Sequence, residues 1–174
     1  LDDLYNSLDQ QAALMMSANN QLSHSPPSSW RCYTKAGSDG AGSSNLYLGG
    51  YGPAAITGYM RDPGAGNTAA GHRRWILYPQ TRRMGTGDIL SSGGYPAANA
   101  LRSWDDNIWG ARPATRDGFV AWPPPGYVPY PVVFARWSFA YPGADFSSAT
   151  VSITRGGASV PVTRYSPVNG YGEN

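Results

Sequence analysis

The chain is poor in the residues that build long helices and in the residue that forms disulfide bonds. Its 174 residues include one lysine, one glutamate and one cysteine, against 22 glycines and 15 prolines. Lysine and glutamate favour helices, whereas glycine and proline interrupt them. We therefore expect a loop-rich fold with few helices. The single cysteine, Cys32, excludes an internal disulfide, leaves the redox compartment open, and is expected to be a small buried residue rather than a nucleophile.

The chain also lacks any long hydrophobic run and any strong excess of charge. No apolar stretch approaches the roughly 18 residues that a membrane-spanning helix needs. The formal net charge of +2 gives no argument for nucleic-acid binding. A hydrophobic content of 41%, with 6 tryptophans and 12 tyrosines, excludes a disordered chain. We expect one folded domain with at most a small appendix, no membrane span and no nucleic-acid partner.

No signal peptide precedes the first helical pattern, so either an export signal has been removed or the chain is not exported. The last residues, NGYGEN, are polar turn residues where a strand is expected to continue. They indicate a fragment or a processed form of a longer protein.

Helical patterns are confined to the first half of the chain. Apolar residues recur every three or four positions from Leu4 to Leu22, which predicts a helix that ends near Leu22. Residues 25–50 are rich in glycine and serine and are expected to be irregular, with one turn of helix near Asn45 and Leu46. The stretch PAAITGYM, residues 53–60, predicts a short helix that opens on proline. HRRWIL, residues 72–77, predicts a short helix or turn whose last three residues enter the core.

The second half of the chain has the pattern of β-structure. Short β-branched and aromatic runs are separated there by proline, glycine and aspartate turns. Helices first and strands later favour an α+β fold over a doubly wound parallel sheet. The strand candidates are residues 83–89, 99–104, 118–122, 131–141, 149–155 and 159–164.

Only two histidines are present, His24 and His72, and each lies at the edge of a helical element. Two imidazoles make half of a first-row metal site, which needs one or two further nitrogen or oxygen ligands. Asp62 follows the short helix at residues 53–60 and is a candidate for a carboxylate ligand. The alternative is that both histidines cap helix ends through hydrogen bonds. The spacing matches no known zinc motif, because there is neither a His-Glu-x-x-His sequence nor a cysteine pair.

The stretch AAGHRRWILYPQTRRMGTG, residues 69–87, resembles the Gly-His-Arg-x-x-Ile-Leu-x-Pro segment and Gly-x-Gly strand of bacterial CAP proteins. CAP stands for cysteine-rich secretory protein, antigen 5 and pathogenesis-related protein 1. Three weaker matches come in the family's order: His24 after the first helix, SSNLYLGG at residues 43–50, and AAITGYMRDPG at residues 54–64. The resemblance covers roughly residues 1–90, and the strands up to Trp104 extend it.

The resemblance implies a three-layer α-β-α sandwich over residues 1–105. The strand candidates after it predict a β-rich extension over residues 106–174, which either packs on this core or begins a small β-sandwich. The resemblance also implies a cleft with two histidines, matched by His24 and His72, and two acidic residues. The first of the family's glutamates falls on Ser44 and the second at or near Asp62, so one carboxylate is lost and the other is shortened. Many family members bind a divalent cation, often zinc, through the histidines. The resemblance further implies an exported, bacterial protein.

Three functions follow as hypotheses. The leading one is a cleft around His24 and His72 that binds a divalent cation and an extracellular ligand, such as a small molecule, glycan or peptide. The second is an extracellular protease or cell-wall glycan hydrolase. It would use either Ser44, His72 and Asp62 as nucleophile, base and orienter, or a metal-activated water between His24 and His72 with Asp62 as general base. The third is an adhesive or structural surface module that uses the aromatic stretch from Trp122 to Tyr141. The oligomeric state stays open.

Overall fold

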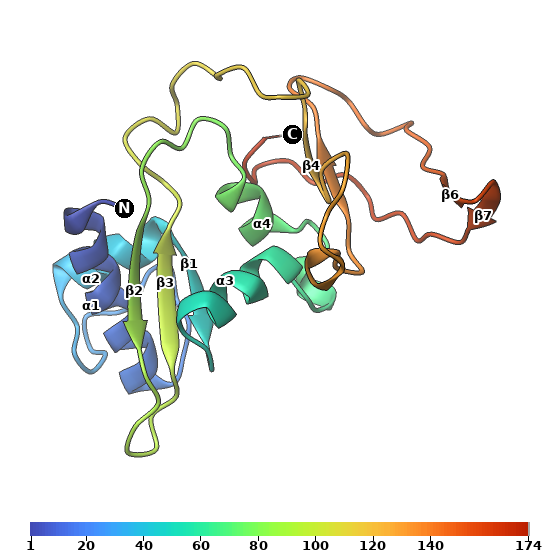
Figure 1. Cartoon of the computed structure of the whole chain (residues 1–174). Helices are drawn as coiled ribbons and strands as arrows, with labels where there is room; N and C mark the ends of the chain where they lie inside the picture. The colour runs from blue at the N-terminus through green and yellow to red at the C-terminus, as the bar shows by residue number, and fades with distance from the viewer. Residues whose placement is uncertain (174) are drawn as a thin grey trace.

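The computed structural model describes residues 1–173, and its first part combines helices with an antiparallel sheet (Figure 1). The mixture of helices and strands confirms the α+β class. The elements of this part are α1 (Asp3–Asn19), α2 (Lys35–Gly42), β1 (Ser44–Leu48), α3 (Gly52–Arg61), the 3-10 turn η1 (Ala65–Asn67), α4 (Gly71–Ile76), β2 (Gly85–Ile89) and β3 (Ala98–Arg102).

The sheet of the first part has the strand order β1-β3-β2, with β3 antiparallel to both neighbours. Helices cover both of its faces (Figure 1). On one face, α1 and α2 pack on Leu46 of β1 and on Ala98 and Ala100 of β3. On the other face, Tyr59 of α3 packs on Leu101 of β3, and α4 adds Ile76 at its edge. The two faces hold separate hydrophobic clusters, and the second cluster supports the residues discussed below.

Helix α1 differs from its predicted form at both ends. It ends at Asn19 rather than near Leu22, because Asn20 takes the left-handed conformation (φ 49°) that commonly ends helices. Leu4 and Leu22 are 65% and 48% exposed, so neither contributes to the core. The buried face is instead made by Tyr5, Asp9, Ala12, Ala13, Met15, Met16 and Ser17.

Two predictions for residues 25–50 are wrong. Helix α2 forms within a stretch whose composition predicts irregular structure, and Asn45 and Leu46 lie in strand β1 rather than in a turn of helix. Glycine gives α2 a low intrinsic propensity, but it also allows a close approach to α1. A Cβ atom on Gly40 would lie 2.6 Å from the carbonyl oxygen of Leu8. Packing against α1 therefore decides the structure of this stretch. Cys32, expected to be buried, is exposed.

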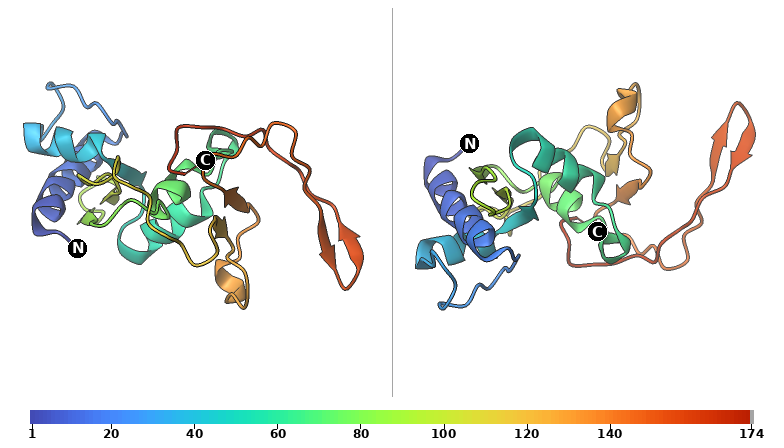
Figure 2. Two further views of the ribbon diagram at one scale, coloured as in Figure 1. Left: turned by 90° about the horizontal axis from the view of Figure 1, so that it is seen from above. Right: turned by 90° about the horizontal axis from the view of Figure 1, so that it is seen from below.

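The second part of the chain contains two small hairpin-like pairs. Strands β4 (Val120–Trp122) and β5 (Ser138–Ala140) pair antiparallel, as do β6 (Ile153–Arg155) and β7 (Ala158–Val160), and a 3-10 turn, η2, spans Tyr130–Val132. Strands β4, β5 and β6 form inside the predicted stretches but are shorter than predicted, whereas β7 begins one residue before its predicted stretch and ends at Val160. Figure 2 shows the β6–β7 pair on an arm that projects away from the rest of the molecule. Among residues 1–173, no helix has the length and apolar character that a bilayer crossing requires.

Candidate functional site

Asp62 directly follows α3 and caps its C-terminal end. Its backbone is left-handed (φ 49°), and its N–H donates to the carbonyl of Gly58 at 2.8 Å. A non-glycine residue in this conformation reverses the chain direction, so the Asp62 side chain turns back toward the start of α4. The side chain is only 1% exposed. A buried carboxylate needs hydrogen-bond donors, and α4 supplies them.

His72 donates to both oxygens of that carboxylate. Its Nδ1 lies 2.8 Å from Oδ1 of Asp62, and its backbone N–H donates to Oδ2 at 3.0 Å. The carboxylate is an acceptor, so Nδ1 carries the proton and the Nε2 lone pair of the neutral ring is left for another partner. The imidazole is 32% exposed, which lets a partner from solvent reach it.

Two further residues hold His72: Tyr59 contacts its ring, and Asn45 contacts its backbone carbonyl. The ring of Tyr59 stacks on the imidazole, with centroids 5.6 Å apart and an angle of 30° between the planes. The Tyr59 hydroxyl is fixed in turn by donating to Oδ1 of Asn99 in β3, at 2.8 Å. Burial raises the pKa of Tyr59, so this hydroxyl stays protonated. Asn45 in β1 donates through Nδ2 to the His72 carbonyl at 3.0 Å. Helix α3 and the sheet thus fix the imidazole orientation.

Arg73, the next residue, is fully buried and anchors α4 to the end of α3. Its Nε donates to the Met60 carbonyl at 2.6 Å, and its Nη2 donates to the Arg61 carbonyl at 3.3 Å. Burial lowers the pKa of Arg73 to about 10, so the side chain remains charged at neutral pH. The expected core trio, Trp75, Ile76 and Leu77, is only half-buried. The residue most deeply buried in this segment is therefore an arginine.

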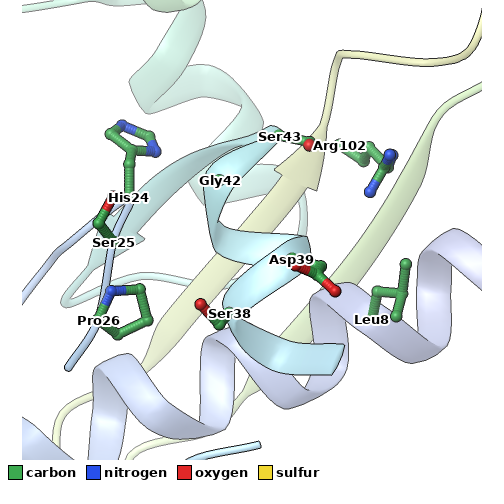
Figure 3. A pocket seen from close by; sticks show the side chains of 9 residues that line it. All are labelled: Leu8, His24, Ser25, Pro26, Ser38, Asp39, Gly42, Ser43 and Arg102. Carbon is green, nitrogen blue, oxygen red and sulfur yellow. The ribbon is translucent and has the colours of Figure 1, made fainter. Parts of the chain in front are cut away.

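His24 lies in a different environment. Its Nδ1 is 2.8 Å from the carbonyl oxygen of Ala41, so it caps the C-terminal end of α2. Figure 3 shows His24 and Arg102 on either side of that helix end, at a hollow of about 470 Å³. The Arg102 guanidinium also donates through Nε to the Trp104 carbonyl. The residues that line the hollow are Leu8, His24, Ser25, Pro26, Ser38, Asp39, Gly42, Ser43 and Arg102.

Ser44 belongs to a buried network beneath α1. Its Oγ lies 2.7 Å from Oδ1 of Asp9 and 2.7 Å from the carbonyl oxygen of Gly40. The other oxygen of Asp9 accepts the backbone N–H of Arg102 at 2.9 Å. A hydroxyl has one proton to donate, so both Ser44 contacts are satisfied when the Asp9 carboxyl is protonated. Burial raises the pKa of Asp9 to about 6, opposed in part by its hydrogen bonds to Ser44 and Arg102.

The structure therefore brings together two of the four predicted site residues, His72 and Asp62. It gives Ser44 and His24 other partners. Within residues 1–173, no three His, Cys, Asp or Glu side chains cluster closely enough to hold a metal ion. Both Asp62 oxygens already receive N–H groups of His72. Within the pair, only Nε2 of His72 is left for a cation, and a first-row metal site needs further ligands that the pair does not supply.

Four residues that contact the candidate site residues are not identified as functional by the sequence patterns: Asp9, Asn45, Tyr59 and Arg136. Arg136 donates to the Asp62 carbonyl. Asn45 lies inside the SSNLYLGG match, so the ordered resemblance already carries a signal for it. Tyr59 is expected from its spacing only as part of the apolar face of a short helix. Neither Asp9 nor Arg136 stands in a motif.

A comparison with protein-family models identifies the family of the chain. The model described as CAP, the cysteine-rich secretory protein family, matches residues 2–102. The chain belongs to the CAP family. The match ends at the last residue of β3, so this CAP region contains all four helices, the three-stranded sheet and the four predicted site residues. CAP proteins are generally extracellular. No curated protein and no solved structure matches the chain significantly.

Proposed function

We propose that the chain is a secreted CAP-type domain that binds a divalent cation at His72, with Asp62 as the carboxylate that orients the imidazole. The observation that carries the proposal is the 2.8 Å contact between Nδ1 of His72 and Oδ1 of Asp62. Metal-ligating histidines almost always donate their other N–H to a carboxylate, a carbonyl or water, which fixes the tautomer and raises the basicity of the ligating nitrogen. A partly exposed imidazole with a fixed orientation is consistent with that role.

Zinc is the cation that we propose first, because neutral imidazole is among its preferred ligands. His24 keeps its predicted role as a second ligand through Nε2, because its Nδ1 meets the Ala41 carbonyl at 2.8 Å, which is the kind of contact that ligating histidines make. An extracellular small molecule, glycan or peptide would occupy a position that the protein leaves open. The proposal also includes the three-layer sandwich over residues 1–105 and the extension over residues 106–174. Helices on both faces of the sheet support the sandwich.

The test is a calorimetric zinc titration at about pH 7.5, where histidine ligands are deprotonated. We expect one site per chain in the wild type and no binding in His72→Ala. Asp62→Asn should weaken the affinity about 10–100-fold, because it replaces the charged carboxylate behind the ligand with a neutral amide that has only one acceptor oxygen. In His24→Ala we expect weaker zinc binding than in the wild type, because the second histidine ligand is lost. A site that survives His72→Ala, or a wild type that binds no zinc, contradicts the proposal.

A hydrolase is the second candidate, and the same pair of residues favours it. A carboxylate that holds the Nδ1–H of a histidine prepares Nε2 to act as a general base. The hydroxyl of Ser44 is engaged by Asp9 and Gly40, so the version that we propose activates water rather than a serine nucleophile.

This version predicts that any hydrolysis of an unstructured peptide or of purified cell-wall glycan disappears in His72→Ala. In Ser44→Ala the rate should remain within about twofold of wild type, because that hydroxyl does not meet the base. The rates are measured with folded variants of matched thermal stability. Activity lost in Ser44→Ala but retained in His72→Ala would contradict the water mechanism.

A further inference from the structure

Arg136, which precedes β5, reaches from the extension to the loop that carries Asp62. Its guanidinium donates to three backbone carbonyls of the loop between α3 and α4: those of Asp62, Asn67 (2.8 Å) and Gly64 (3.0 Å). The planar guanidinium offers five N–H donors in a fixed geometry, so one side chain can bridge several carbonyls that face in different directions. The extension thereby fixes a loop 74 residues away in sequence.

The bridged loop determines where the Asp62 carboxylate lies. Asp62 is held in a left-handed conformation that is unfavourable for a residue with a Cβ atom, and its carbonyl is one of the three acceptors. Asn67 lies at the other end of the loop, where its carbonyl also accepts the N–H of Ala70, immediately before α4. Arg136 therefore ties together the residue that ends α3 and the turn that starts α4.

A second contact joins the extension to the same place. Nη1 of Arg73, which follows His72 directly, donates to Oγ of Ser138 in β5 at 3.2 Å. The strand pair β4–β5 lies beside the α3–α4 loop (Figure 1). The extension thus contacts the Asp62 side of the pair through Arg136 and the His72 side through Ser138.

We propose that Arg136 is a positioning residue for the Asp62–His72 pair. It fixes the Asp62 backbone, the Asp62 carboxylate then holds the Nδ1–H of His72, and Nε2 is presented to the ligand. The role in ligand binding rests on the proposed function, whereas the positioning itself is a property of the unliganded protein. The β-rich extension is accordingly part of the support of the CAP site and not an independent appendix.

The experiment compares Arg136→Ala and Arg136→Lys with Arg164→Ala in the full chain. Arg164 is a matched control, because its guanidinium also bridges backbone carbonyls within the extension, those of Phe146 (2.6 Å) and Ser147 (3.3 Å). The first readout is the solvent exchange rate of the Nδ1 proton of His72, measured by NMR without ligand. The second is the zinc dissociation constant. Calorimetric melting confirms that each variant is folded.

We expect Arg136→Ala to exchange the Nδ1 proton at least about tenfold faster and to bind zinc about 10–100-fold more weakly. Arg136→Lys should lie between wild type and Arg136→Ala, because an ammonium group cannot match the three directions of the guanidinium. Arg164→Ala should resemble wild type in both readouts.

Wild-type exchange in Arg136→Ala overturns the proposal, as does an equal acceleration in Arg164→Ala, which would indicate a general loss of stability. If Arg136→Ala does not fold, Arg136→Lys decides, and wild-type exchange in that variant overturns the proposal. A wild type that binds no zinc defeats the proposed function, while the exchange rates still decide the role of Arg136.

Discussion

At the scale of single residues, Asp9 in α1 and Asp62 after α3 differ in the groups that hydrogen-bond to their carboxyl oxygens. The Asp62 carboxylate receives two N–H groups from His72. Asp9 is fully buried, and one of its oxygens meets a serine hydroxyl that also contacts a carbonyl. The Asp9 environment therefore favours the neutral carboxyl, in line with its raised pKa.

This difference predicts a pH dependence of stability. The pKa of Asp9 rises from 3.8 to about 6 on folding. Between these values the folded state binds more protons, so the free energy of unfolding decreases as pH rises. The contribution is fully present below about pH 4, is lost above about pH 6, and is on the order of 2–3 kcal/mol.

Urea unfolding of wild type and Asp9→Asn from about pH 4 to 8 measures this contribution. The asparagine variant cannot titrate at this position, so its stability should lack this decrease. Asp2 and Asp145, whose pKa values are lowered, titrate in both proteins and cancel in the comparison. Parallel curves for the two proteins would show that folding does not raise the pKa of Asp9.

At the residue scale, two of the four site residues expected from the sequence, His72 and Asp62, contact each other in the structure. The Gly-His-Arg segment points to His72 as a site residue. The position of Asp62 after a short helix makes it a candidate carboxylate. Arg136 is not predictable in this way, because its role depends on a contact across 74 residues and it stands in no motif. Ser44 and His24 align with the family pattern, but alignment does not determine which neighbour a side chain contacts.

At the scale of elements, packing against α1 overrides local propensity. Glycine at Gly40 in α2 and Gly87 in β2 lets both elements approach the α1 backbone closely. A pattern-based prediction counts the glycines of residues 25–50 as evidence against regular structure, which is why it misses α2 and β1. Elements with their own signals, such as the proline-initiated α3 and the apolar β3, are predicted within a few residues.

The close approach gives a prediction for Gly87→Ala. A Cβ atom there would lie 2.1 Å from the backbone nitrogen of Gln10, which cannot move without shifting α1. We expect a loss of about 1–3 kcal/mol or more, as is typical of overpacking. The control is Gly66→Ala, since no atom lies within 4 Å of a Cβ atom at that position. Thermal unfolding measures both, and equal melting temperatures would argue against tight α1–β2 packing.

At the scale of the whole molecule, the extension is attached to the CAP region through arginines. Besides Arg136 and Arg73, Arg74 in α4 donates to the carbonyls of Val168 (2.7 Å) and Glu173 (2.9 Å). The aromatic residues proposed for adhesion divide into two kinds. Trp122 is half-buried and donates through Nε1 to the Val132 carbonyl at 3.0 Å, whereas Trp137 is 53% exposed. An adhesive role would therefore depend on Trp137 rather than on Trp122.

The central claim is that Asp62 holds His72 so that Nε2 is the atom that binds a cation. The most direct measurement is a crystal structure of the zinc-soaked full chain with anomalous diffraction at the zinc edge. The account predicts an anomalous peak about 2.0–2.1 Å from Nε2 of His72, with Nδ1 still bonded to Asp62. A peak at the hollow beside His24 without one at His72, or zinc bound at Nδ1, would contradict it.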